Sequence, residues 1–155
     1  MRLDLNPQSG MFEMKTAVVV ASLLLLGISI TNAQQAGKTS TASGVFTAEQ
    51  AKNGESAFQA KCATCHGADL HSTEPEAPDL TEGAFRFGWN GKTIANRFEE
   101  IRGTMPYGNA RSLDDQTYID IVAYILQFNG IPSGNQKLEP DVPALEKIVV
   151  TVPGG

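Results

Sequence analysis

The chain has few of the residues that bind metals or cross-link small domains: among 155 residues there are 2 Cys, 2 His, 4 Met and 1 Trp. Two cysteines cannot form the disulfide framework of a small secreted scaffold. Together with both histidines they suffice for at most one zinc site. The formal net charge is −5, from 12 Lys and Arg against 17 Asp and Glu. This balance argues against nucleic-acid binding and against attraction to an anionic membrane surface.

A long hydrophobic run is also lacking. Residues 17–30 (AVVVASLLLLGISI) are apolar and uncharged, but a membrane-spanning helix needs about 20 such residues. Lys15 precedes the run, and small residues in Thr31-Asn32-Ala33 follow it, so we expect a secretory signal peptide over residues 1–33. The segment before Met14 is not clearly basic, and Met14 is the more typical start. An uncleaved N-terminal anchor is the alternative.

The rest of the chain divides into three parts by composition. Residues 34–45 are polar and small, which predicts a flexible linker. Residues 46–133 contain the helical patterns and predict one mostly helical domain. Residues 134–155 contain three prolines and no long periodic run, which predicts an extended C-terminal tail.

Three helices are expected within the helical domain. Thr47 opens the capping box TAEQ, and a helix follows as far as Lys61. A second helix is expected over residues 93–102. The third helix has the strongest apolar periodicity, with Ser112 as its N-cap, and it is expected to continue until Asn129-Gly130.

Cys62-Ala63-Thr64-Cys65-His66 is a C-x-x-C-H sequence, the attachment motif of haem c. Two thiols three positions apart at a helix end can each add to one vinyl group of a haem. The adjacent histidine then lies beneath the iron and binds it. The motif therefore predicts one covalently bound haem c, with Cys62 and Cys65 as thioether anchors and His66 as an iron ligand. Haem c is attached outside the cytoplasm, in agreement with the export signal.

Three other interpretations of the cysteine pair are less favoured. A thioredoxin-like redox pair is disfavoured because no βαβ pattern surrounds it. A zinc site would need Cys62, Cys65, His66 and His71 together, and the adjacency of Cys65 and His66 makes tetrahedral closure awkward. A plain disulfide is the third interpretation.

The second axial ligand of the iron can be approached by elimination. His71 lies only five residues past His66, on a loop leaving the same side, so it would have difficulty reaching the opposite face. Met105 is the only methionine outside the expected signal segment and the residues before it. We therefore predict Met105 as the distal ligand, with core packing as the alternative for a lone methionine.

Other residues are expected around the haem. Proximal histidines usually donate their second ring N–H to an acceptor, and the carbonyl of Pro78 is the candidate for His66, with an ordinary proline turn as the alternative. Leu80 would then pack against the haem. Trp89 is expected at the haem edge, with plain core packing as the alternative. Two arginines are weaker candidates for the propionates, and solvated surface positions are the simpler interpretation of them: Arg86 and Arg102.

From about Val45 to Pro132 the chain resembles mono-haem class I cytochromes c. The resemblance rests on Gly54 and Phe58 before the C-x-x-C-H motif, Pro78-Asp79-Leu80, Thr104-Met105-Pro106, and Val122-Ala123-Tyr124-Ile125-Leu126. It implies an all-α fold in which the N- and C-terminal helices cross around one covalently bound haem. Gly54 would permit the close approach, and Phe58 and Tyr124 would pack there. Residues 46–133 would be the cytochrome c domain.

A narrower similarity points to small cytochromes and cytochrome domains associated with quinoprotein (PQQ) alcohol dehydrogenases. It rests on Phe87-Gly88-Trp89-Asn90-Gly91-Lys92-Thr93, Ile101, Thr104-Met105-Pro106 and Asn129-Gly130-Ile131-Pro132.

The resemblance implies a periplasmic one-electron carrier rather than an enzyme. An iron with both axial positions filled offers no open site to a substrate. We expect a dehydrogenase donor, such as a quinoprotein, and an acceptor such as a terminal oxidase. Docking would be transient, onto basic partner patches, with no nucleic acid and, after signal cleavage, no membrane. Two alternatives stay open: a fixed cytochrome subunit of a dehydrogenase complex, and a haem sensor or peroxidase-like enzyme.

Overall fold

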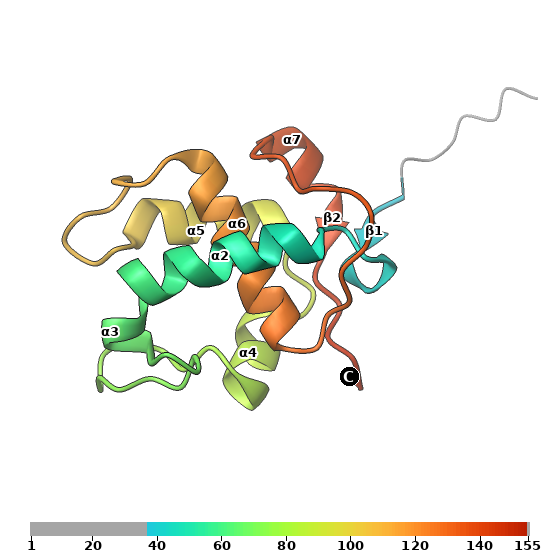
Figure 1. Ribbon diagram of the computed structural model, residues 1–155. Helices are drawn as coiled ribbons and strands as arrows, with labels where there is room; N and C mark the ends of the chain where they lie inside the picture. The colour runs from blue at the N-terminus through green and yellow to red at the C-terminus, as the bar shows by residue number, and fades with distance from the viewer. Residues whose placement is uncertain (1–36, 155) are drawn as a thin grey trace, which may run out of the picture. The chain divides into compact units, whose positions relative to one another are not determined.

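The computed structural model describes residues 37–154 (Figure 1). The expected signal peptide and the first residues of the expected linker, 34–36, lie outside the described residues. The elements, in chain order, are β1 (Thr39–Ser40), the 3-10 turn η1 (Thr41–Ser43), α2 (Ala48–Lys61), α3 (Ala63–His66), α4 (Glu82–Trp89), α5 (Ile94–Thr104), α6 (Asp115–Phe128), α7 (Val142–Leu145) and β2 (Ile148–Val149). Within residues 37–154, no helix has both the length and the apolar content needed to cross a membrane.

Helices α2 and α6 cross at close range in the middle of the domain (Figure 1). A Cβ atom added to Gly54 of α2 would stand 1.8 Å from the carbonyl oxygen of Asp120 in α6. One turn further along each helix, the rings of Phe58 and Tyr124 pack with centroids 5.4 Å apart. Residues 118–126 of α6 are all buried, as expected for a helix enclosed by others. The expected all-α fold with crossing first and last long helices is confirmed.

Side-chain caps fix where the longer helices begin. Thr47 caps α2 as expected, and Thr93, expected as the first residue of the second helix, caps α5. Each accepts a hydrogen bond from the N–H three residues on, at 3.1 and 3.2 Å. The N-cap of α6 is Asp114 rather than the expected Ser112, and its Oδ1 accepts from the N–H of Thr117 at 2.9 Å. A carboxylate both accepts this bond and interacts favourably with the helix dipole, which explains the difference.

Helix α4 is not predicted by the sequence pattern. Its residues include Gly83 and Gly88, which lower helix propensity, so the segment has little local preference for a helix. It buries Phe85 and Trp89, one turn apart, with ring centroids 5.1 Å from each other. Tertiary burial of these two rings therefore stabilises α4.

The two ends of the described segment pack onto the helices. Strands β1 and β2 pair in parallel, with Thr39 opposite Ile148. Thr41 is fully buried, and its hydroxyl accepts from the N–H of Thr151 at 2.9 Å. Residues 37–45 and 134–154 thus differ from the expected flexible linker and extended tail, because they pair with each other and the second segment buries apolar side chains. The buried apolar residues of the second segment are Leu138, Leu145, Val150 and Val152.

A buried polar network joins α2, α6 and the segment after α6. Nε2 of Gln50 donates to Oδ1 of Asp120 and to the carbonyl of Leu138, and the N–H of Leu138 donates to Oε1 of Gln50, all at 2.9 Å. Gln116 adds a further bond to Asp120 at 2.6 Å. Gln50 therefore does not complete the capping box with its side chain, as the TAEQ sequence suggests, but links three segments in the interior.

Candidate haem site

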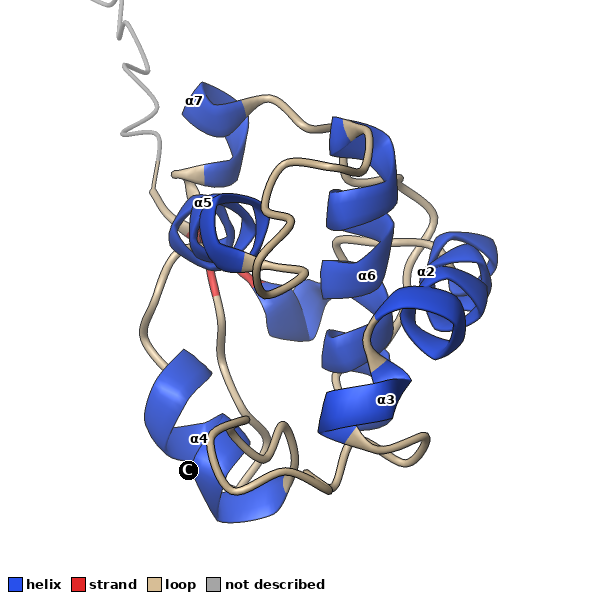
Figure 2. Ribbon diagram, turned by 90° about the vertical axis from the view of Figure 1, so that its left-hand side faces the viewer, coloured by secondary structure: helices blue, strands red, loops and turns tan. Residues whose placement is uncertain are grey.

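A cavity of about 930 Å³ opens between the end of α2, α3, the loop after α3, and helices α4, α5 and α6. In Figure 2, α3 lies at the lower right, α4 at the lower left and α5 above α4. The volume is at the upper end of the range for cofactor and ligand pockets. All seven residues assigned to the cofactor from sequence line this cavity: Cys62, Cys65, His66, Pro78, Leu80, Trp89 and Met105.

The two cysteines lie where α2 gives way to α3. Cys62 ends α2, and its N–H donates to the carbonyl of Phe58 at 2.8 Å. Cys65 is on α3 and is exposed, and both thiols are free. Burial, and next the neighbouring Cys65, raise the pKa of the Cys62 thiol to about 11. The Cys62 sulfur is therefore protonated at neutral pH, as a neutral thiol at an apolar cavity wall.

His66 is buried, and its Nδ1 lies 3.0 Å from the carbonyl oxygen of Pro78. A carbonyl can only accept a hydrogen bond, so Nδ1 carries the proton and donates it. The other ring nitrogen, Nε2, then keeps its lone pair for a metal ion. The ring of Phe58 packs near the imidazole, with centroids 6.4 Å apart. His66 is thus held in one orientation and one tautomer.

Met105 follows directly after α5 and is half-buried. The hydroxyl of Tyr118, a buried residue of α6, donates to the backbone carbonyl of Met105 at 2.8 Å. This bond ties the segment after α5 to the centre of the domain. The thioether of Met105 and the imidazole of His66 belong to the lining of the same cavity, although they come from separate segments.

His71 is not part of the cavity lining. Its Nδ1 lies 3.0 Å from Oδ2 of Asp79, and more than half of the side chain is exposed. The hydrogen bond to Asp79 is the main cause that raises the pKa of His71. Hydrogen bonds from Thr81, and next the bond with His71, lower the pKa of Asp79 to about 2. The structure thus places His71 in an exposed hydrogen-bonded pair with Asp79 on the loop.

Trp89 and Leu80 complete the apolar part of the lining. Trp89 is 5% exposed and Leu80 is half-buried. The guanidinium of Arg97 lies 5.9 Å from the ring centroid of Trp89, and Arg97 also lines the cavity. Sequence reasoning missed Arg97. Helical periodicity could have indicated it, because the α5 residues that line the cavity are spaced i, i+3, i+4 and i+7 along one face of the helix: Arg97, Glu100, Ile101 and Thr104.

The two arginines considered for the propionates lie elsewhere. Nη2 of Arg86 donates to the carbonyl of Pro153 at 2.8 Å. Arg102 pairs with Glu99 at 2.8 Å and with Asp115 at 2.9 Å. Neither lines the cavity. Arg86 therefore stabilises the backbone near the C-terminal end, and Arg102 links α5 to α6, and neither contacts a cofactor site.

The chemistry of these donors fits a haem c. Two thiols and an imidazole with a free nitrogen stand together, and a thioether stands in another part of the same lining. Within residues 37–154, no three His, Cys, Asp or Glu side chains are grouped so that they could bind a metal ion. The zinc interpretation is therefore not supported by any cluster of ligands in this part of the chain.

Residues 49–125 match the family model described as cytochrome C oxidase, cbb3-type, subunit III. No curated protein sequence matches the chain. A solved structure that the chain resembles is the sulfane dehydrogenase SoxCD from Paracoccus pantotrophus, with 18% identity and a TM-score of 0.46 over 98% of this chain and 69% of that chain. Neither comparison bears on quinoprotein alcohol dehydrogenases, and that narrower similarity stays a prediction. Given the family match and the crossing of α2 and α6, the described domain has the cytochrome c fold, which implies a haem cofactor.

Proposed function

We propose that this protein is a one-electron carrier with a single haem c, attached through Cys62 and Cys65 and bound axially by His66 and Met105. The observation that carries the proposal is that one cavity is lined by these four side chains, which come from two separate segments, residues 62–66 and Met105. When bound, haem supplies the Fe(III)/Fe(II) couple. The residues of this chain hold it, exclude water from it and fix its axial ligands.

The axial pair decides the kind of chemistry. Nδ1 of His66 donates to Pro78, so in the neutral imidazole the lone pair that would bind the iron is on Nε2. A thioether from Met105 on the other side would leave no position open to a substrate and would raise the reduction potential. Both features suit outer-sphere electron transfer and argue against the peroxidase-like alternative.

We further propose that the donor is a dehydrogenase, such as a quinoprotein, that the acceptor is a terminal oxidase or similar protein, and that exchange takes place in the periplasm after export. Acidic side chains outnumber basic ones on the cavity lining: Glu74, Glu76, Asp79 and Glu100 against Lys61 and Arg97. With a net charge of −5, this favours partners with basic patches. The rate of reduction by a purified donor should therefore fall as salt is raised.

The test is to produce the chain in a host that attaches haem c, together with three variants. The double variant Cys62→Ala/Cys65→Ala should carry no covalent haem. Met105→Ala should open the sixth iron position, lower the reduction potential and let the reduced protein bind CO rapidly. Ile101→Ala is the matched control, because it shortens another apolar side chain of the same lining without removing a ligand.

Each part of the proposal can fail separately. Thioether-linked haem in the double cysteine variant would overturn the attachment site. An unchanged spectrum and potential in Met105→Ala, or equal effects of Met105→Ala and Ile101→Ala, would overturn the axial assignment and leave Met105 as a packing residue. Rapid CO binding by the reduced wild-type protein would favour the sensor or peroxidase-like alternative.

A further inference from the structure

The last residues of the described chain run along the α4–α5 connection. The C-terminal strap, defined as residues 148–153, pairs there through its backbone. The N–H of Gly91 donates to the carbonyl of Val150, and the N–H of Val150 donates to the carbonyl of Lys92, both at 2.9 Å. Thr93 and Val149 form an antiparallel bridge at the same place.

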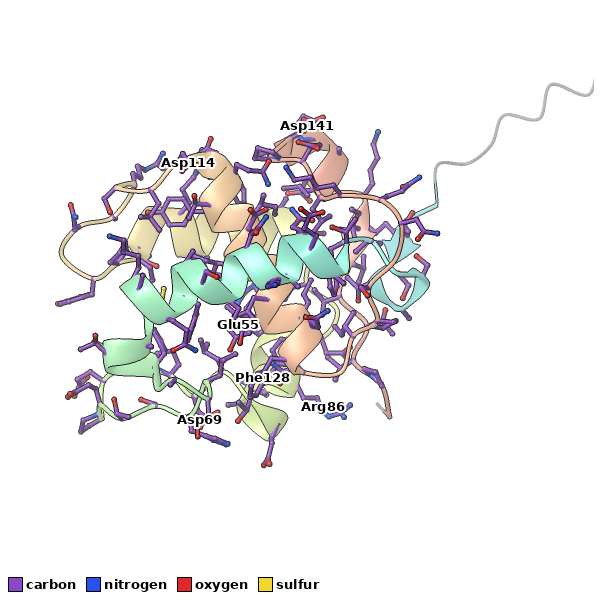
Figure 3. The ribbon with its side chains drawn as sticks, viewed as in Figure 1. Glu55, Asp69, Arg86, Asp114, Phe128 and Asp141 are labelled. Carbon is purple, nitrogen blue, oxygen red and sulfur yellow. The ribbon has the colours of Figure 1, made fainter. Side chains whose placement is uncertain are left out.

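Two side chains near the end of α4 extend this contact. Oδ1 of Asn90 accepts from the N–H of Val152 at 3.1 Å. Nη2 of Arg86 donates to the carbonyl of Pro153 at 2.8 Å. Figure 3 shows Arg86 extending from α4 toward the C-terminal end of the chain. Val152 itself is buried, so hydrogen bonds and apolar packing act on the same few residues.

Helix α4 has few other attachments. It buries only Phe85 and Trp89, and its N-cap residue, Thr81, makes no side-chain capping bond. Its first residue, Glu82, has φ +46, a left-handed conformation that costs free energy in a residue with a side chain. Such an element is expected to open locally more easily than α2 or α6. The strap is therefore well placed to decide how often α4 opens.

Helix α4 is also one wall of the cavity, to which it contributes Ala84, Gly88 and Trp89. We propose that the C-terminal strap positions Trp89 against the haem, with Asn90 and Arg86 as the positioning residues that couple the strap to α4. This inference rests on the proposed function, because it assumes a haem in the cavity. The strap acts through α4 and touches no cofactor itself.

The chain contains one tryptophan, so a single indole N–H resonance reports on the position of Trp89 in the reduced, haem-loaded protein. Ring-current shifts from a haem fall steeply with distance. In Asn90→Ala the resonance should move toward its position in the haem-free Cys62→Ala/Cys65→Ala protein. Amide exchange in residues 82–92 should become about fivefold faster, the effect of losing one hydrogen bond, while exchange in α2 and α6 should keep its rate.

Three further variants sharpen the test. Asn90→Asp keeps an acceptor oxygen for Val152 and should leave the indole resonance at its wild-type position. Arg86→Met keeps the apolar stem but loses the bond to Pro153, and should act like Asn90→Ala. Thr151→Val is the matched control: it removes only the bond that Ser40 donates to the strap, 2.8 Å long, and should leave Trp89 and α4 unchanged.

The positioning role would be overturned, with the proposed function left intact, by an unmoved indole resonance in both Asn90→Ala and Arg86→Met or by equal acceleration of exchange in α2, α4 and α6. An equal effect of Thr151→Val would also overturn it, since the strap would then act through general stability. If the indole resonance were the same in the wild-type and haem-free proteins, the haem would not lie beside Trp89, and the proposed placement of the haem would fail first.

Discussion

The close approach of α2 to α6 at Gly54 can be tested by a substitution that prevents it. Gly54→Ala adds one methyl group at the crossing. That carbon would stand 1.8 Å from the carbonyl oxygen of Asp120 and 2.9 Å from the nitrogen of Ile121. Both are backbone atoms within α6, so no side-chain rotation can relieve the clash. The helices would have to separate, in an interior that is packed like a crystal.

Two opposing effects set the magnitude. Replacing glycine by alanine inside a helix gains about 1 kcal/mol in helix propensity. Overpacking a close contact costs about 1–3 kcal/mol and sometimes more, and a contact with rigid backbone lies at the upper end. We therefore expect Gly54→Ala to lower the free energy of unfolding by about 2 kcal/mol or more. The same separation would loosen the Phe58–Tyr124 pair one turn away, and Phe58 lines the cavity.

The assay is denaturant unfolding of the haem-loaded protein, followed by far-ultraviolet circular dichroism and extrapolated to water. Gly103→Ala and Gly83→Ala are matched controls, because both glycines are helical and a Cβ at either would meet no heavy atom within 4 Å. These controls should stabilise the protein by up to about 1 kcal/mol. If Gly54→Ala were as stable as the wild type or the controls, the close crossing would not be a feature of the folded protein.

Two further predictions concern polar contacts. Gln50→Leu leaves the buried N–H and carbonyl of Leu138 without partners and should cost about 3 kcal/mol in denaturant unfolding; Gln116→Leu, which removes one bond, should cost less, and equal costs would contradict the role of Gln50. The hydrogen bond to Asp79 raises the pKa of His71 above its ordinary 6.5, so its stabilisation is complete below about pH 6.5 and lost as pH rises through the folded-state pKa. The stability difference between wild type and His71→Gln should therefore shrink as pH rises above about 6.5, and a constant difference would refute this.

Elements with strong local signals were predictable, and elements made by long-range contacts were not. α2, α5 and α6 each combine a side-chain cap with periodic apolar residues, and each begins within three residues of the predicted position. α4 has two glycines in eight residues and no capping bond, so its local preference is weak. It forms because Phe85 and Trp89 can be buried.

The segment after α6 shows the same division. It pairs with β1 and with the α4–α5 connection through backbone hydrogen bonds, such as those of Val150 with Gly91 and Lys92. Backbone pairing of two-residue strands leaves no pattern in the side chains, since any residue except proline can supply the N–H. The buried Leu138, Leu145, Val150 and Val152 are too irregularly spaced to indicate one helix or one strand.

The candidate site was more predictable than the fold around it. C-x-x-C-H is local, so three of its residues could be named from spacing alone, and Met105 followed by elimination. Arg97 was missed because it is separated from every named residue by at least four positions and becomes visible only when α5 is placed on the cavity. Arg86 and Arg102 were candidates for the propionates because of their charge, but charge does not predict where a side chain points. Arg86 contacts the C-terminal strap, and Arg102 contacts α6.

The position of each cavity segment depends on a residue that comes later in the chain. The loop with Pro78 is tied down by Asn129, whose Nδ2 donates to the carbonyl of Leu80 at 2.9 Å. The segment with Met105 is tied down by the Tyr118 hydroxyl, and α4 by the C-terminal strap. The motif around Cys62 can form as soon as α2 and α3 do, but the opposite wall of the cavity requires α6 and the end of the chain. The proposed covalent attachment is therefore encoded locally, whereas the proposed second axial ligand and the exclusion of water depend on the completed fold.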